Sequence, residues 1–171
     1  MKHYVVLVGL SGSGKTAAGE GAAKQLDAPL VDIDSQIEAV AGKSIAEIFA
    51  KDGEAAFRDA ERAAVARALD GEPAILVPGA GWAAQPGNLD LVTRNVFIIY
   101  LNTTPAEAAR RLASATDRPL LEGDREAVLR VQLGEREASY EQANAVVETM
   151  GMTAREVADR VAALARKSAG W

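Results

Sequence analysis

The sequence predicts an α/β fold, a three-layer α/β/α arrangement around a five-stranded parallel sheet. Short runs that are apolar throughout alternate with longer segments of helical period, which is typical of a parallel sheet covered on both faces. A glycine-rich segment directly follows the first apolar run. No internal repeat, low-complexity tract or interdomain linker interrupts the 171 residues, so we expect a single domain spanning 1–171.

Each expected strand is one of the short apolar runs, which are, in chain order, Tyr4–Val8, Pro29–Ile33, Ala74–Val77, Val96–Leu101 and Ala145–Val147. The expected helices cover residues 15–26, 35–41, 44–51, 54–69, 105–115, 125–143 and 154–167. Two helix starts carry capping signals: Thr104 stands before Pro105, and Thr153 stands three residues before Glu156.

The segment Gly9–Thr16, with the sequence GLSGSGKT, matches the pattern G-x-x-x-x-G-K-[ST] completely. Between a strand and a helix, such a loop points backbone N–H groups at phosphate oxygens. Lys15 is expected to reach the β- and γ-phosphates, and the Thr16 hydroxyl to bind Mg²⁺. The alternative is a glycine-rich turn that happens to contain Lys-Thr. The residues expected to bind ATP here are Gly12, Ser13, Gly14, Lys15, Thr16 and Ala17.

Two carboxylates stand at the end of the second expected strand, Asp32 within it and Asp34 directly after it. Because strand side chains alternate, they are expected to share one face. One would then hold the water shell of the metal, while the other holds or deprotonates a hydroxyl acceptor. A pair of solvated acids at a strand end is the alternative. The strand Ala74–Val77 ends without an acid, and no guanine-reading N-K-x-D sequence occurs, so a small kinase is favoured.

Arg58 and Glu61 stand three residues apart in the expected helix 54–69 and therefore share one face. Glu61 can orient Arg58, whose planar guanidinium suits bidentate capture of a carboxylate. The alternative is a surface ion pair.

The polar stretch 114–124 is expected to be a mobile lid between two helices. The proline after Arg118 disfavours helix there, so the arginine side chain could swing over a nucleotide as the lid closes. A solvated loop arginine is the alternative.

The stretch VPGAGW, residues 77–82, places Gly79, Ala80 and Gly81 directly after an expected strand. The two glycines either shape a turn or let another group approach the main chain closely. Open α/β sheets bind their ligands at the carboxyl ends of strands, so this turn is a candidate substrate contact.

The composition argues against several classes of binding partner and site. The net charge of −5 argues against broad binding to nucleic acid or to anionic membranes. The absence of cysteine excludes disulfides and zinc–thiolate sites. No signal-peptide layout or run of roughly 20 apolar residues occurs. We expect a cytoplasmic monomer whose partners are small molecules.

Together these motifs resemble the shikimate kinase family. The resemblance covers nearly the whole chain, in the right order: GLSGSGKT, DID, GKSIAEIFAKDGEAAFRDAE, the GAG turn, RPLL, and R-x-x-x-Y at Arg136–Tyr140. After the glycine-rich loop, the stretch Gly42–Glu61 is the most specific. The resemblance implies a P-loop kinase fold with a mobile lid and ATP-dependent phosphorylation of the shikimate 3-hydroxyl to shikimate 3-phosphate, on the route to chorismate and aromatic amino acids.

On the nucleotide side, the resemblance implies that Lys15 holds the β- and γ-phosphates, that Thr16 binds Mg²⁺, and that Asp32 lies in the outer shell of the metal. It implies that the lid residue Arg118 neutralises the transferring phosphoryl group. Arg111 would stack on adenine, and Arg110 beside it is the alternative.

On the acceptor side, the resemblance places shikimate near the helices of about 35–62. It implies that Asp34 binds the reacting hydroxyl and takes its proton. Arg58 and Arg136 would clamp the shikimate carboxylate, and the Gly79–Gly81 turn would offer backbone N–H groups.

Three features depart from the family pattern: Ala80 stands where the family has a middle glycine, Glu20 where a basic residue is usual, and the run Met150–Met152 where polar or basic residues are common. Ala80 keeps a backbone N–H, and its methyl group is tolerable if φ is negative, which we predict.

Two rival functions remain open at this stage. One is a kinase of the same fold for another small hydroxy acid such as gluconate, because paired arginines fit any carboxylate. The other is a non-catalytic nucleotide-binding regulator.

Overall fold

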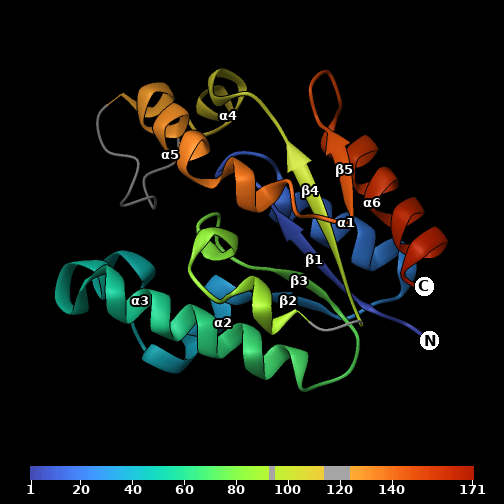
Figure 1. The fold of residues 1–171 in the computed structure, drawn as a ribbon, viewed down its shortest axis with the longest axis horizontal. Helices are drawn as coiled ribbons and strands as arrows, with labels where there is room; N and C mark the ends of the chain where they lie inside the picture. Colours follow the sequence, from blue (N-terminus) through green and yellow to red (C-terminus); the bar gives the residue numbers. More distant parts are fainter. Residues whose placement is uncertain (93–94, 114–123) are drawn as a thin grey trace.

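The computed structural model describes residues 1–92, 95–113 and 124–171. Five parallel strands form one sheet in the order β2-β3-β1-β4-β5 (Figure 1). They are β1 (Tyr4–Val8), β2 (Leu30–Asp32), β3 (Ile75–Val77), β4 (Val96–Asn102) and β5 (Ala145–Glu148). The predicted fold class is confirmed, and each expected strand differs from the observed one by no more than one residue at either end.

Six helices cover the two faces of this sheet within the described ranges. They are α1 (Lys15–Leu26), α2 (Ile33–Ala41), α3 (Ile45–Leu69), α4 (Pro105–Arg111), α5 (Arg125–Tyr140) and α6 (Ala154–Ser168). Val5 and Leu7 pack toward α1 and α6, whereas Tyr4, Val6 and Val8 pack toward the other four helices. Figure 1 shows α6 on one side of the strands and α3 and α5 on the other. The alternation of buried strand side chains thus produces the predicted three layers.

Two glycines allow α1 to pack closely on its neighbours. A Cβ atom at Gly19 would lie 2.8 Å from a methyl group of Val77 in the sheet. A Cβ atom at Gly21 would lie 2.6 Å from the Cβ atom of Ala158 on α6. The sequence alone offers no reason for Gly21, because its partner lies far away along the chain.

The second strand ends earlier, and its helix starts earlier, than predicted. Asp32 is the N-cap of α2, and its side chain accepts a hydrogen bond from the backbone N–H of Ser35 at 2.9 Å. Asp34 consequently lies in the first helical turn, so the prediction that it shares a strand face with Asp32 is wrong. The physical reason is the cap: an aspartate at this position satisfies a free N–H of the helix and favours helix over strand directly after it.

Other boundaries differ by a few residues. The two expected helices 44–51 and 54–69 form one element, α3, interrupted by the non-helical Gly53. The helices α4 and α5 end at Arg111 and Tyr140, earlier than predicted. Two short 3₁₀ segments, η1 (Trp82–Ala84) and η2 (Leu89–Leu91), were not predicted. Residues 114–123 of the predicted lid, including Arg118, lie outside the described residues.

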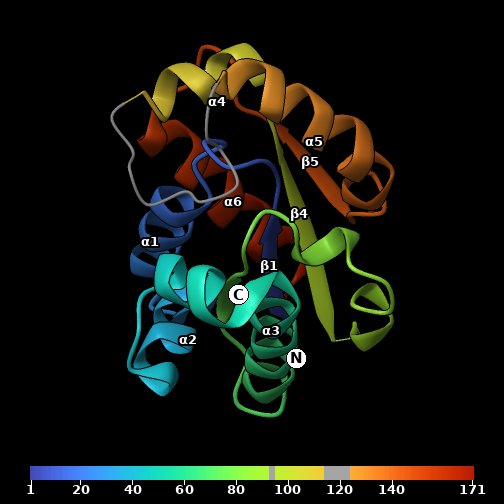
Figure 2. The ribbon, with the colours of Figure 1, turned by 90° about the vertical axis from the view of Figure 1, so that its left-hand side faces the viewer.

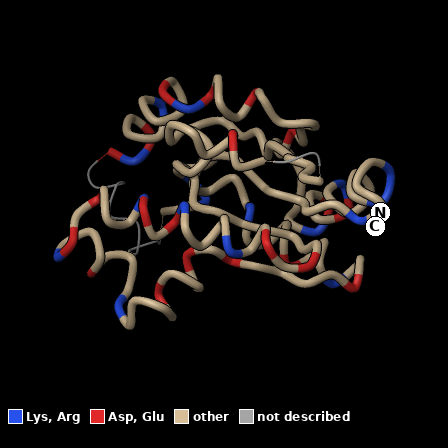
Figure 3. The backbone as a smooth tube through the Cα atoms, turned by 60° about the horizontal axis from the view of Figure 1, so that its bottom comes forward, with Lys and Arg blue, Asp and Glu red and all other residues tan. Residues whose placement is uncertain are grey.

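Charged residues of both signs are spread along the described chain. Figure 3 shows basic and acidic residues mixed along most elements. In the part of the chain that the structure describes, no helix has the length and apolar character needed to cross a membrane.

Candidate active site

A pocket of about 740 Å³ opens beside the carboxyl ends of the strands. Figure 2 shows the surrounding elements, with α2 and α3 below and α4 and α5 above. The predicted site residues that line it are Gly12, Gly14, Lys15, Thr16, Ala17, Asp32, Asp34, Arg58, Gly79, Ala80, Gly81 and Arg136. Ser13, Glu61 and Arg111 lie outside this lining. A volume of this size accommodates small-molecule ligands.

The glycine-rich loop has the backbone shape that phosphate binding requires. Gly12 and Gly14 have φ values of 81° and 89°, a left-handed conformation that residues with a Cβ atom adopt only at a cost. Gly14 is the N-cap of α1 and contributes no side-chain hydrogen bond. The N–H groups of the first turn point out of this end of α1 and, together with the helix dipole, suit an anion there.

The ammonium group of Lys15 lies over this loop. It donates hydrogen bonds to the carbonyl oxygens of Gly9 and Leu10 at 2.8 and 2.9 Å. The side chain is largely buried and also lines the pocket. A buried cation in this place complements the charge of a triphosphate.

Glu61 connects Arg58 to the turn after β3. Its carboxylate is fully buried and accepts hydrogen bonds from Arg58 Nη1 at 2.9 Å and from the backbone N–H of Gly79 at 3.0 Å. Burial raises the pKa of the Glu61 carboxyl group, and the neighbouring Arg58 guanidinium opposes this rise. The alternative of a solvated surface ion pair is thereby excluded, because one partner has no exposure.

The glycines of the turn are explained by close approach. A Cβ atom at Gly79 would overlap Glu61 Oε1, and one at Gly81 would lie 2.5 Å from Arg58 Nη2. Asp27 is the one described non-glycine residue with a positive φ, and neither turn glycine has one. The predicted negative φ at Ala80 is therefore confirmed, and its methyl group adds no backbone strain.

One N–H group of this turn has a partner within the protein. The N–H of Gly79 donates to Glu61 at 3.0 Å in this structure, and the contact of Gly79 with the acceptor stays a prediction. The N–H groups of Ala80 and Gly81 stay candidates as well. The sequence could not reveal the pairing with Glu61, because Glu61 lies on α3, 18 residues earlier.

Arg136 projects from α5 into the same pocket. It is largely buried, and its Nη1 lies 3.4 Å from Gln132 Oε1. One turn later, the fully buried Tyr140 donates a hydrogen bond from its phenol to the Ala80 carbonyl oxygen at 2.6 Å. The residue-level predictions missed Tyr140, although its spacing of four residues from Arg136 is the signal that could have found it.

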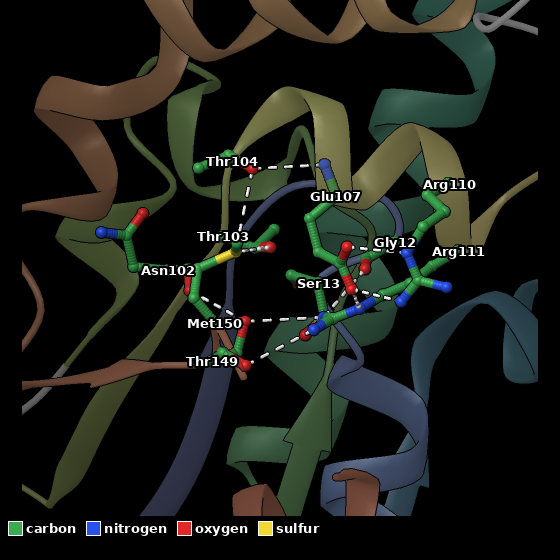
Figure 4. A network of polar contacts seen from close by, with 10 residues as sticks. All are labelled: Gly12, Ser13, Asn102, Thr103, Thr104, Glu107, Arg110, Arg111, Thr149 and Met150. Carbon is green, nitrogen blue, oxygen red and sulfur yellow. Dashed lines mark hydrogen bonds and ion pairs between the residues drawn. The ribbon is translucent and has the colours of Figure 1, made fainter. Parts of the chain in front are cut away.

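Arg111 and Arg110 point to different surroundings, although both pair with Glu107. Figure 4 shows the Arg111 side chain between the glycine-rich loop and Thr149, which follows β5. Its guanidinium lies 3.4 Å from the carbonyl oxygens of both Gly12 and Thr149. The Arg110 side chain is 72% exposed. Of the two arginines, Arg111 is therefore the one that borders the phosphate loop.

Comparisons with known proteins identify relatives over almost the full length of the chain. A family model described as "Shikimate kinase" matches residues 11–166. A shikimate kinase from Thermobifida fusca (strain YX) is 40% identical over 163 residues, which is 94% of this chain and 94% of that protein.

Solved structures agree in fold. A shikimate kinase from Acinetobacter baumannii in complex with shikimate matches with a TM-score of 0.92 at 30% identity, over 98% of this chain and 94% of that one. A gluconokinase from Sinorhizobium meliloti 1021 matches with a TM-score of 0.65 at 16% identity, over 99% of this chain and 94% of that one. The second likeness shows the fold alone.

Proposed function

The chain belongs to the shikimate kinase family, and from this premise we propose how its residues transfer the γ-phosphoryl group of ATP to the 3-hydroxyl of shikimate. The predicted family and the predicted phosphotransferase activity, which serves aromatic amino-acid biosynthesis, are confirmed. These residue roles rest on the observation that one pocket joins the phosphate loop to Asp34, Arg58 and Arg136.

The phosphates of ATP bind to the N–H groups at the start of α1 and to Lys15. Thr16 and Asp32 line the same pocket and fit a Mg²⁺ ion, which prefers oxygen donors. The Thr16 hydroxyl would bind the ion, and the Asp32 carboxylate would hold its water shell. Bound there, Mg²⁺ would neutralise phosphate charge. Arg111 borders the loop and is the residue we assign to adenine. Arg118 lies outside the described residues, and we assign it the predicted role of neutralising the transferring phosphoryl group.

The shikimate carboxylate binds to Arg58 and Arg136, which reach the pocket from α3 and α5. This places the 3-hydroxyl beside Asp34, which accepts its proton. The hydroxyl oxygen forms a bond to the γ-phosphorus while the bond to the β-bridging oxygen breaks, and ADP leaves. Phosphoryl transfer depends mainly on positioning and charge neutralisation, and these residues provide both.

The assay that tests this proposal measures ADP release with Mg-ATP and shikimate, quinate, gluconate or no acceptor. We expect release with shikimate well above the acceptor-free rate. Equal rates with and without shikimate would contradict the proposal. Release with gluconate alone would favour the rival hydroxy-acid kinase, and no release with any acceptor would favour a nucleotide-binding regulator.

Ala80→Gly is expected to change the KM for shikimate by less than about threefold, because glycine adopts the same negative φ and keeps the N–H. Steady-state kinetics at saturating ATP measures this effect. A large decrease in the KM would contradict the expectation and indicate that the alanine has adapted this turn to another acceptor.

The single-domain organisation, the cytoplasmic location and the monomeric state are predictions as well. Size-exclusion chromatography coupled to light scattering measures the oligomeric state, and cell fractionation measures the location. Limited proteolysis tests whether the chain behaves as one domain.

A further inference from the structure

The side chain of Tyr140 connects two parts of the acceptor pocket without lining it. Its phenol donates a hydrogen bond of 2.6 Å to the carbonyl oxygen of Ala80, in the turn after β3. Its ring is fully buried and packs against Tyr100, with 5.1 Å between the ring centroids. On α5 it lies one turn after Arg136. A single side chain thus ties the turn to the helix that carries the second arginine.

The hydrogen bond fixes the direction of a neighbouring N–H group. The described residues contain no cis peptide bond, so the planar Ala80–Gly81 peptide is trans and its C=O and N–H point in opposite directions. Because the carbonyl of Ala80 points to Tyr140, the N–H of Gly81 points away from it. Tyr140 is absent from the pocket lining, whereas Gly81 belongs to it.

Arg58 contacts Gly81, the residue that carries this N–H group. A Cβ atom at Gly81 would lie 2.5 Å from Arg58 Nη2, so the guanidinium packs directly on the Gly81 backbone. The turn is therefore bonded to α5 at the Ala80 carbonyl and contacted by α3 at Gly81. A rotation of the Ala80–Gly81 peptide would turn the Gly81 N–H away from its present direction, beside the guanidinium of Arg58.

We propose that Tyr140 is a positioning residue for shikimate: its phenol orients the Ala80–Gly81 peptide so that the Gly81 N–H and the guanidinium of Arg58 meet the acceptor. This inference rests on the proposed function. Burial raises the pKa of Tyr140 to about 12, so the phenol keeps its proton and stays a donor at neutral pH.

The test compares Tyr140→Phe with Tyr100→Phe. Tyr100 is a matched control, because it is also a buried tyrosine of the same core, but its phenol donates to the Asn102 side chain at 2.9 Å and not to the pocket turn. Steady-state kinetics gives the KM for shikimate and for ATP in both variants and in the wild type. KM does not depend on the concentration of active enzyme, so the comparison holds even where a variant is only partly folded.

Tyr140→Phe is expected to raise the KM for shikimate about threefold to tenfold and to leave the KM for ATP unchanged, as for the loss of one hydrogen bond. Tyr100→Phe is expected to change neither. Equal shikimate KM values in the two variants, or an equal rise in the shikimate and ATP KM values of Tyr140→Phe, would overturn the inference. A wild-type protein that releases no ADP with shikimate would instead contradict the proposed function.

Discussion

Asp34→Asn is expected to lower the kcat for shikimate phosphorylation by about 10²–10⁴-fold, the usual contribution of a positioned general base. Asp34 lines the pocket from the first turn of α2, and its Oδ1 lies 3.6 Å from the position of a Cβ atom on Gly79. Asparagine has nearly the same shape but cannot accept the hydroxyl proton at neutral pH. The substitution slows proton transfer and not nucleotide binding, so the Kd for ATP should be nearly unchanged.

Two measurements check this prediction. Single-turnover kinetics reports the chemical step, and titration with a nucleotide reports ATP binding. Asp159→Asn is the matched control, because Asp159 accepts a hydrogen bond from Gln25 on the opposite face of the sheet and does not line the pocket of Asp34. We expect this control to leave kcat and ATP binding unchanged. A loss of ATP binding in Asp34→Asn would mean that Asp34 belongs to the nucleotide side and not to the acceptor.

Arg136→Ala is expected to raise the KM for shikimate by about 30-fold or more, with a much smaller effect on the KM for ATP. Removing one partner of a buried, hydrogen-bonded charge pair costs about 2–5 kcal/mol, which corresponds to this factor or more. Arg136 is only 9% exposed, so water screens its charge little. Its loss leaves Arg58 as the one described arginine of the predicted carboxylate clamp.

The same helix offers a matched control for this second substitution. Arg130 on α5 is 66% exposed and pairs with Glu126 at the surface. Exposed pairs of this kind contribute little, so Arg130→Ala should leave both KM values unchanged. If the KM for ATP rose as much as the KM for shikimate in Arg136→Ala, this arginine would not belong to the carboxylate clamp.

Several parts of the site followed from patterns between near neighbours in the chain. The glycine-rich loop is defined within eight residues, and steric limits on φ make its glycines necessary wherever it occurs. The pairing of Arg58 with Glu61 followed from helical periodicity. Asp34 was misplaced because local patterns were ambiguous there. In a short apolar run, an aspartate that caps a helix, as Asp32 does, looks the same as an aspartate at the end of a strand.

Other contacts join residues that no local pattern relates. Glu61 meets Gly79 across 18 residues, and Tyr140 meets Ala80 across 60. Gly21 has no room for a side chain because Ala158 packs against it, and Ala158 lies on a helix at the other end of the chain. Which residues meet in this way depends on how the helices pack against the sheet, and this packing depends on many side chains at once.

The sequence by itself determined the sheet, the phosphate loop, the family and most of the candidate site, because periodicity, capping and backbone sterics act over a few residues. The tertiary structure explains why the turn after β3 contains two glycines. Neither has a positive φ, and both leave room for the buried Glu61–Arg58 pair. It also decided that the Gly79 N–H pairs with Glu61, because a buried carboxylate needs hydrogen-bond donors and the fold brings this one to it.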